Sequence, residues 1–290
     1  MRVIVLLVLM LIHSTPALAD GLKSAGTASV AEVIDGDTVR LSDGREVRLT
    51  GIQAPKLPLG RKDFPVWPLA PEAKQALESL VLDRTVELRT GEATMDRWGR
   101  ALVHLYRDDG LWIQGEMLRQ GWARVYSFPD NRVLVDDMLV LEKQARGRGL
   151  GIWALDHYAV RPADEVTGKD FHAFLVAEGR VVKAAAVKGQ VFLNFGHDWR
   201  TDFTVVIPRP ALKLFRRAGV DPLAFEGRDI QVRGWVEMYN GPMIEATHPE
   251  AIVPLDRKGV LAGKHKPLTK RKGHGKGRSH TDQLQDGEGS

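Results

Sequence analysis

The sequence predicts a mainly β protein with helices (α+β), in which a small strand-rich barrel with three helices precedes a second small β-barrel. Short runs of apolar and β-branched residues alternate with turn sequences such as Asp-Gly and Asn-Gly along most of the chain. Three helix patterns interrupt the first half. A linker-like stretch, Arg161-Pro162-Ala163-Asp164, separates the two strand-rich blocks. The chain of 290 residues is long enough for two domains.

The first block begins with strands that flank an acidic turn. Residues 29–33 are expected to form a strand that enters a turn at Asp35-Gly36-Asp37, and residues 38–41 form the strand that leaves it. Ser42-Asp43-Gly44-Arg45 is a hairpin turn, which places a third strand at 46–49. The Pro-rich stretch 57–69 is expected to form a loop.

The later elements of this block include all three helices. Pro71 and Glu72 begin the first helix, because proline suits the first helical position and an acidic residue suits the first turn. The remaining predicted elements are strands at 85–89 and 101–106 and helices at 113–120 and 133–145. Such a set fits a small closed barrel with helices packed on it.

The second block is again rich in strands. Strands are predicted at 171–177, 181–187, 191–195, 203–207, 229–237 and 243–246, with one helix at 211–218. We therefore assign residues 29–155 to the first domain, 156–168 to a linker and 169–255 to a second small β-barrel domain, which the resemblance described below makes OB-like.

The two ends of the chain predict export and a basic tail. A basic start, a short apolar run and Ala17-Leu18-Ala19 before Asp20 are the parts of a signal peptide over 1–19, so we expect a periplasmic or secreted protein without stable membrane insertion after cleavage. The chain has no cysteine, which excludes disulfides and thiolate chemistry. Residues 256–290 are expected to be disordered and could either hold a polyanion or serve solubility.

Five motifs in the first block occur in order and at suitable spacings. They are Val-Ile-Asp-Gly-Asp-Thr-Val at 33–39, Arg48-Leu49 with Pro55, Pro-Glu-Ala at 71–73, Asp-Arg-Trp-Gly-Arg at 96–100 and Leu-Arg-Gln-Gly-Trp-Ala at 118–123. Over residues 29–155 the chain resembles the staphylococcal nuclease (thermonuclease) family. The resemblance implies a five-stranded oligonucleotide/oligosaccharide-binding barrel with three helices, and a calcium-dependent phosphodiesterase that acts on DNA and RNA.

The residue types suit that chemistry. Two guanidinium groups can grip a phosphodiester and stabilise its extra charge in the transition state. Carboxylate oxygens can hold a hard cation such as Ca²⁺ beside the same phosphate. By resemblance, Arg48 and Arg100 take the clamping role and Asp37 is a metal ligand, while Asp35 and Thr38 shape the turn.

Two positions depart from the family pattern. Gln53 stands where the family has its second metal carboxylate, and Lys56 stands where it has the general-base glutamate. Gln53 still offers a neutral oxygen, so metal affinity is expected to fall, whereas Lys56 repels a cation but can bind phosphate. Loss of a general base costs about 10²–10⁴ in rate. Three acids near this segment could supply another base: Glu46, Asp63 and Glu72.

The second block also carries residues suited to nucleic acid. It resembles accessory barrel modules of the oligonucleotide-binding type found in bacterial nucleic-acid proteins. Trp199, Arg200, Trp235 and Tyr239 could stack on bases, each stack being worth about 1–3 kcal/mol. Packing in the core is the alternative for the aromatic residues of the second block, and we prefer it for Phe192, Phe195 and Phe203.

These observations lead to three functional hypotheses. The first is an exported phosphodiesterase that hydrolyses single-stranded or frayed DNA or RNA, assisted by Ca²⁺ or another divalent cation. The second is a catalytically degenerate nucleic-acid-binding protein, and the third is a structural envelope protein. The chain has no Gly-rich phosphate loop and no serine-hydrolase turn, which argues against a nucleotide cofactor or nucleotide-triphosphate chemistry.

Overall fold

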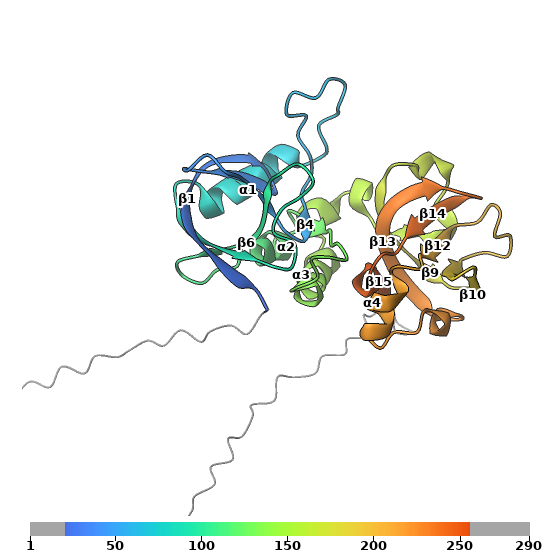
Figure 1. Cartoon of the computed structure of the whole chain (residues 1–290). Helices are drawn as coiled ribbons and strands as arrows, with labels where there is room; N and C mark the ends of the chain where they lie inside the picture. Colours follow the sequence, from blue (N-terminus) through green and yellow to red (C-terminus); the bar gives the residue numbers. More distant parts are fainter. Residues whose placement is uncertain (1–20, 256–290) are drawn as a thin grey trace, which may run out of the picture.

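The computed structural model describes residues 21–255, which form two β-rich domains placed side by side (Figure 1). The predicted signal peptide and basic tail lie outside these residues. Within residues 21–255 no helix has the length and apolar character needed to cross a bilayer.

The first domain is built on a closed five-stranded barrel, as predicted. Its strands, in order around the barrel, are β1 (Lys23–Asp35), β2 (Thr38–Leu41), β3 (Glu46–Leu49), β6 (Ala101–Arg107) and β5 (Thr85–Thr90). Only the β3–β6 pairing is parallel among these neighbours. A short ladder between β4 (Ile52–Gln53) and β7 (Arg124–Val125) lies beside the barrel.

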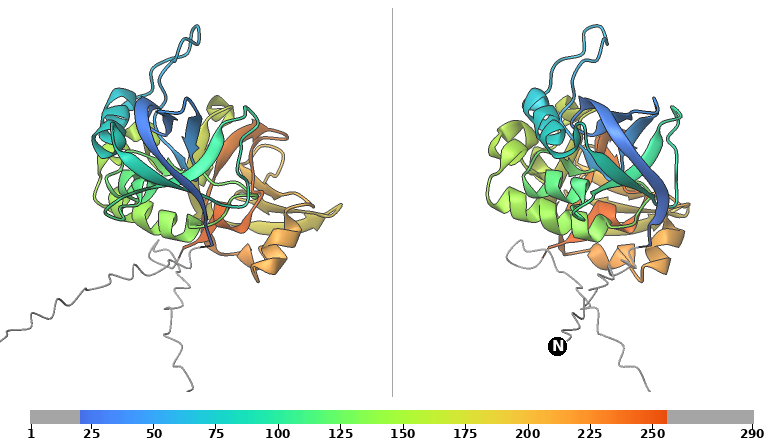
Figure 2. Two further views of the ribbon diagram at one scale, coloured as in Figure 1. Left: turned by 60° about the vertical axis from the view of Figure 1, so that its left-hand side comes forward. Right: turned by 90° about the vertical axis from the view of Figure 1, so that its left-hand side faces the viewer.

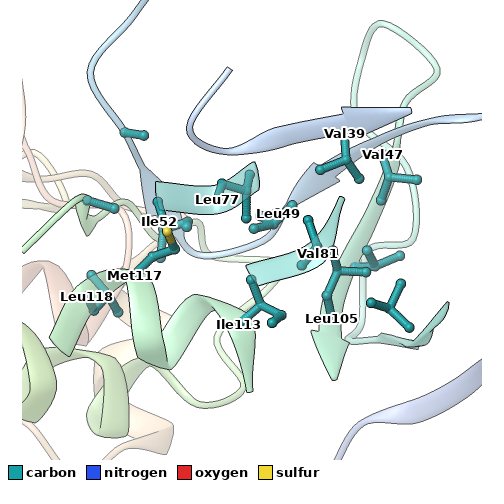
Figure 3. Packing of buried hydrophobic residues seen from close by; sticks show 14 of the residues in the cluster. Val39, Val47, Leu49, Ile52, Leu77, Val81, Leu105, Ile113, Met117 and Leu118 are labelled. Atoms are coloured by element: carbon teal, nitrogen blue, oxygen red, sulfur yellow. The ribbon is translucent and has the colours of Figure 1, made fainter. Parts of the chain in front are cut away.

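Three helices accompany this barrel, again as predicted: α1 (Ala70–Val81), α2 (Ile113–Arg119) and α3 (Val135–Gly147). Leu77 and Val81 of α1 are fully buried and point toward Leu49 and Leu105 of the barrel (Figure 3). Burial of such aliphatic side chains stabilises the domain by about 1.5–3 kcal/mol each.

The register of β3 decides which side chains face outward. Val47 and Leu49 are buried in the barrel, whereas Glu46 and Arg48 alternate with them on the outer face. Val47 pairs with Ala101 of β6, so Arg100 arrives beside Glu46 on that same face. The loop between β4 and α1 projects away from both domains in every view (Figure 2).

The second domain is an eight-stranded sheet. Its strands are β8 (Arg161–Pro162), β9 (Phe174–Arg180), β10 (Lys183–Val187), β11 (Gln190–Asn194), β12 (Thr204–Ile207), β13 (Asp229–Met238), β14 (Pro242–Glu245) and β15 (Ile252–Pro254). The order is β10-β11-β12-β14-β13-β9-β8, with β15 also pairing to β13, and α4 (Leu212–Arg217) follows β12. The terminal strands β10 and β8 do not pair with each other, so the prediction of a second closed barrel is not confirmed.

The predicted linker 156–168 is more ordered than its composition indicated. Arg161 and Pro162 form β8, which pairs in parallel with β9 and so belongs to the second sheet. Ala163 is buried in the core of that domain. Val166 belongs to the same core, so the backbone ladder and two buried apolar side chains fix a segment that carries no strand-like pattern of its own.

Helix α3 lies between the two domains (Figure 1). Its Glu142 is buried and accepts hydrogen bonds from both terminal nitrogens of Arg233 on β13, at 3.0 and 2.9 Å. At the edge of the same junction, Arg132 forms an ion pair with Glu250. Paired charges thus join the domains.

Candidate active site

The acidic turn closes the end of β1 and is packed from two sides. The backbone N–H of Asp37 donates to Oδ1 of Asp35 at 3.1 Å, which tightens the turn. A Cβ atom on Gly36 would lie 2.6 Å from Cβ of Ala54 and 3.0 Å from Cβ of Ala73. Only glycine therefore allows the turn to approach both the loop after β4 and helix α1.

Asp37 is fully buried, and both of its carboxylate oxygens are occupied. The backbone N–H of Ala54 donates to Oδ2 at 2.8 Å, and Nη1 of Arg48 lies 2.7 Å from Oδ1. Nζ of Lys56 donates to Oδ1 at 2.6 Å and to Oδ2 at 2.7 Å. Asp37 is therefore held between two side-chain cations.

Lys56 also reaches the second acidic residue of the turn. Its Nζ donates to Oδ2 of Asp35 at 3.1 Å, so a single ammonium contacts three carboxylate oxygens. Burial would raise the pKa of Asp37, but the charges of Arg48 and Lys56 outweigh it and hold that pKa well below its usual range. Burial and the neighbouring Asp37 charge raise the pKa of Asp35.

Arg48 is committed to partners within the barrel. Besides its ion pair with Asp37, Nη1 donates to the carbonyl of Asp37 at 2.9 Å and Nη2 donates to the carbonyl of Ile52 at 2.8 Å. The side chain is only 11% exposed. Arg48 thus ties β3 to the acidic turn and to β4, and contributes a fixed positive charge there.

Arg100 is more open than Arg48. Its Nε donates to Oδ2 of Asp96 at 2.7 Å, and Nη1 lies 3.8 Å from Oε1 of Glu46. The side chain is 26% exposed, beside the strongly exposed ring of Trp98. The structure therefore brings Arg48 and Arg100 to one face of the barrel wall, with Glu46 beside Arg100.

The side chain of Gln53 is engaged by Arg124. Its amide oxygen accepts hydrogen bonds from Nε of Arg124 at 2.9 Å and from Nη2 at 2.7 Å. Nη1 of Arg124 donates to the carbonyl of Phe174 in the second domain at 3.0 Å. Gln53 was predicted as a weak metal ligand, but its one acceptor oxygen is already shared by two donors.

Arg124 is a structural residue that sequence reasoning did not single out. It directly follows Ala123, the last residue of the fifth motif, and is buried between the domains. Burial lowers its pKa to about 10. Its hydrogen-bond partners, Gln53 and Phe174, lie 71 and 50 positions away in the sequence. No local sequence pattern predicts contacts over such separations.

A divalent cation does not fit the residues present. Calcium takes six to eight oxygen ligands. Here the ammonium of Lys56 lies at hydrogen-bond distance from both Asp35 and Asp37, and the amide oxygen of Gln53 accepts from Arg124. Among residues 21–255 no cluster of three or more His, Cys, Asp or Glu side chains could bind a metal.

Of the three acids considered as alternative bases, Glu46 lies beside Arg100, whereas the other two and the base-stacking residues lie elsewhere. Asp63 and Glu72 are exposed, in the projecting loop and in the first turn of α1. Among the stacking candidates, Trp199 is 50% exposed with the Arg200 guanidinium 4.7 Å from its ring centroid, and Tyr239 is 68% exposed.

Trp235 has a different environment. Its indole N–H donates to the hydroxyl of Tyr126 at 3.0 Å, and its ring packs edge-on against Tyr126 and Phe174. This aromatic group joins the first domain to β9 and β13. As preferred above, Phe203 is buried in the second core, and Phe195 packs against it. Phe192 is only partly buried.

Comparison with known proteins agrees with this architecture. Residues 46–155 match the family model described as staphylococcal nuclease homologue. An uncharacterized endonuclease of Escherichia coli O157:H7 is 33% identical over 129 residues, covering 43% of this chain and 75% of that protein. The thermonuclease of Staphylococcus hyicus is 27% identical over 157 residues, covering 52% and 91%, and endonuclease YncB of Bacillus subtilis is 27% identical over 141 residues, covering 47% and 65%.

Proposed function

Because the chain belongs to the staphylococcal nuclease family, we propose that its barrel domain binds a phosphodiester of DNA or RNA and hydrolyses it. The observation that carries this proposal is the shared outer face of Arg48 and Arg100 beside the acidic turn. A phosphodiester is anionic, so fixed guanidinium groups lower the cost of the additional negative charge that develops during attack by water.

The two arginines have different roles in this proposal. Arg100 is partly exposed: Asp96 accepts from its Nε at 2.7 Å, whereas Nη1 makes a long, 3.8 Å contact to Glu46, so the terminal nitrogens of the guanidinium can engage a phosphate. Arg48 is fixed by Asp37 and by backbone carbonyls, and it supplies a positive charge without moving. Among the three acids considered as alternative bases, Glu46 contacts Arg100, whereas Asp63 and Glu72 lie in the projecting loop and in the first turn of α1. We assign to Glu46 the general-base role that Lys56 cannot perform.

The test is cleavage of end-labelled single-stranded DNA and RNA by the mature protein, with Ca²⁺, with Mg²⁺ and with EDTA. Arg100→Ala is expected to lower the cleavage rate by about 10²–10³, the usual effect of removing one charge-stabilising donor. The matched control is Arg40→Ala, because Arg40 also contacts Glu46 but is 45% exposed on β2. Equal rates for the two folded variants would refute the proposed role of Arg100.

A second candidate function is binding without cleavage. The observation that favours it is the saturation of Asp37 by Lys56 and Arg48, because a carboxylate held by two cations is a poor acceptor of a proton from water. Oligonucleotide binding that falls with rising salt, together with intact substrate after prolonged incubation, would support this function in place of hydrolysis.

The proposal extends to the second domain. Trp199 and Tyr239 occupy neighbouring turns, since Gly241 approaches Thr201 so closely that a Cβ would lie 2.9 Å from its carbonyl. Two exposed rings on adjacent turns can stack on unpaired bases of the same strand. Trp199→Ala is expected to weaken single-strand binding about tenfold, whereas Leu223→Ala, at an exposed apolar residue elsewhere in the domain, should leave it unchanged.

Export is also part of the proposal. It rests on the basic start, apolar run and Ala17-Leu18-Ala19 of the first residues. Fractionation of cells that express the full chain, followed by sequencing of the mature N-terminus, should find a periplasmic or secreted protein that begins near Asp20. A chain retained in the cytoplasm with its first residues intact would refute it.

A further inference from the structure

The acidic turn already contains a cation that belongs to the chain itself. Nζ of Lys56 lies 2.6 and 2.7 Å from the two oxygens of Asp37 and 3.1 Å from Oδ2 of Asp35. An ammonium has three N–H donors, and here each has a carboxylate oxygen within reach. Arg48 covers Asp37 from another side, at 2.7 Å from Oδ1.

Burial makes a cation at this position necessary. Asp35 is 3% exposed and Asp37 is fully buried, and the two are separated by a single glycine. Two adjacent carboxylates out of contact with water repel each other strongly and lose their hydration, so they need compensating charge. Of these two acids, Arg48 forms an ion pair with Asp37, whereas Lys56 bridges both.

The same contacts work against a divalent ion. A cation placed between Asp35 and Asp37 would meet the ammonium at a few ångströms, where like charges repel. The neutral oxygen that could complete its coordination, on Gln53, accepts two hydrogen bonds from Arg124. Displacing Lys56 would free the turn, but the ammonium would lose its three carboxylate contacts.

We propose that the Lys56 ammonium is the resident cation of this site, and that the acidic turn keeps its geometry and its charge balance without a divalent metal. The inference rests on the proposed function for the statement that this site binds a phosphate. The charge balance of the acidic turn can be measured independently of that function. It predicts that phosphate engagement at Arg100 does not require Ca²⁺.

The test is calcium binding by the mature protein, measured by titration calorimetry and by thermal unfolding with excess CaCl₂ or with EDTA. The wild-type protein should show no saturable heat and a Tm change below about 1 °C, because a ligand that does not bind cannot stabilise. In Lys56→Gln the Tm should fall, and Ca²⁺ should now restore several degrees by occupying the vacated position. The matched control is Lys62→Gln, at an exposed lysine of the same loop.

Saturable Ca²⁺ binding by the wild-type protein would overturn the proposal, and so would a folded Lys56→Gln that responds to Ca²⁺ no more than Lys62→Gln. If Lys56→Gln does not fold, Lys56→Arg keeps the charge and should fold without binding Ca²⁺; an arginine variant that binds Ca²⁺ would equally refute the idea. None of these measurements involves cleavage, so a protein that cuts no oligonucleotide would remove the proposed function and leave this result standing.

Discussion

The side chains of Gln53 and Arg124 form a pair that links the candidate active site to the second domain. The amide oxygen of Gln53 accepts from Nε and Nη2 of Arg124, and Nη1 of the same guanidinium donates to the carbonyl of Phe174 on β9. Gln53 immediately precedes Ala54, whose N–H binds Asp37. A residue of the second domain thus supports the segment that positions the acidic turn.

Replacing Arg124 by leucine should destabilise the protein by about 2–5 kcal/mol, because it leaves the Gln53 oxygen and the Phe174 carbonyl buried without donors. Urea unfolding measures the loss. The matched control is Arg61→Leu, at an exposed arginine that also donates to backbone carbonyls. If Arg124→Leu lowers the free energy of unfolding no more than the control does, the Gln53–Arg124 pair does not contribute to stability.

The local patterns of this sequence predict the strands around the acidic turn well. Residues 38–41 and 46–49 match β2 and β3 at both ends. A short hairpin with Asp-Gly in its turn fixes where the two strands begin and end and which side chains face the core. The first strand is different: it was expected from Ser29 but begins at Lys23. That extension is polar and exposed, and backbone pairing of Lys23 with Thr90 holds it.

The composition of the site could be predicted more fully than its contacts. The motif order identified the acidic turn, Arg48 and Arg100, and it also marked Gln53 and Lys56 as departures. Where those two side chains point depends on distant partners: Arg124 lies 71 positions from Gln53, and Asp37 lies 19 positions before Lys56. The periodicity of a sequence does not indicate which distant residue a side chain will contact. It also does not indicate whether the terminal strands of a sheet pair with each other, so closure of the second sheet was predicted but not confirmed.

The buried ion pair between Glu142 and Arg233 predicts a large and asymmetric mutational effect. Arg233→Met leaves the Glu142 carboxylate buried without its main partner and should cost about 3–5 kcal/mol in urea unfolding. Adding Glu142→Gln should recover part of this loss, because a neutral amide can still accept from the N–H of Val125. Arg180→Met, at an exposed pair with Asp229, should cost less than about 1 kcal/mol.

The order of these losses tests the explanation. In Arg233→Met, Arg146, at 3.9 Å, is the cation that still faces Glu142. If the double variant with Glu142→Gln is less stable than Arg233→Met alone, the loss of charge compensation at Glu142 is not the source of the destabilisation. The two sites form one network, so their effects are not expected to add.

Gly36→Ala should destabilise the barrel by about 1–3 kcal/mol, because the added methyl group would overlap Cβ of Ala54 and crowd Cβ of Ala73. The cost is steric, and relief requires the loop that carries Lys56 to move away from Asp37. Thermal unfolding measures it, with Gly147→Ala as the matched control, because no atom lies within 4 Å of a Cβ at Gly147. Equal Tm values for the two variants would contradict the close packing of the turn.

The burial of His248 at the domain junction indicates that acid weakens this junction. Its Nε2 lies 2.7 Å from Oγ of Ser127 in the first domain, and burial lowers its pKa to about 4 despite the opposing charge of Glu250. The folded protein therefore favours the neutral ring. The stability that this contributes is complete above the usual pKa of about 6.5 and is lost as the pH falls from there through about 4.

Urea unfolding at neutral pH and near pH 4.5 measures this contribution. Protonation of His248 should account for about 2–3 kcal/mol of the stability lost between these conditions. His248→Gln cannot titrate, so its loss should be smaller than that of the wild-type protein by that amount, whereas His197→Gln, at an exposed histidine, should follow the wild-type protein. If the wild-type protein and His248→Gln lose the same stability on acidification, the buried ring of His248 does not couple pH to the junction. The carboxylates, or His157, whose pKa burial also lowers, would then account for the loss.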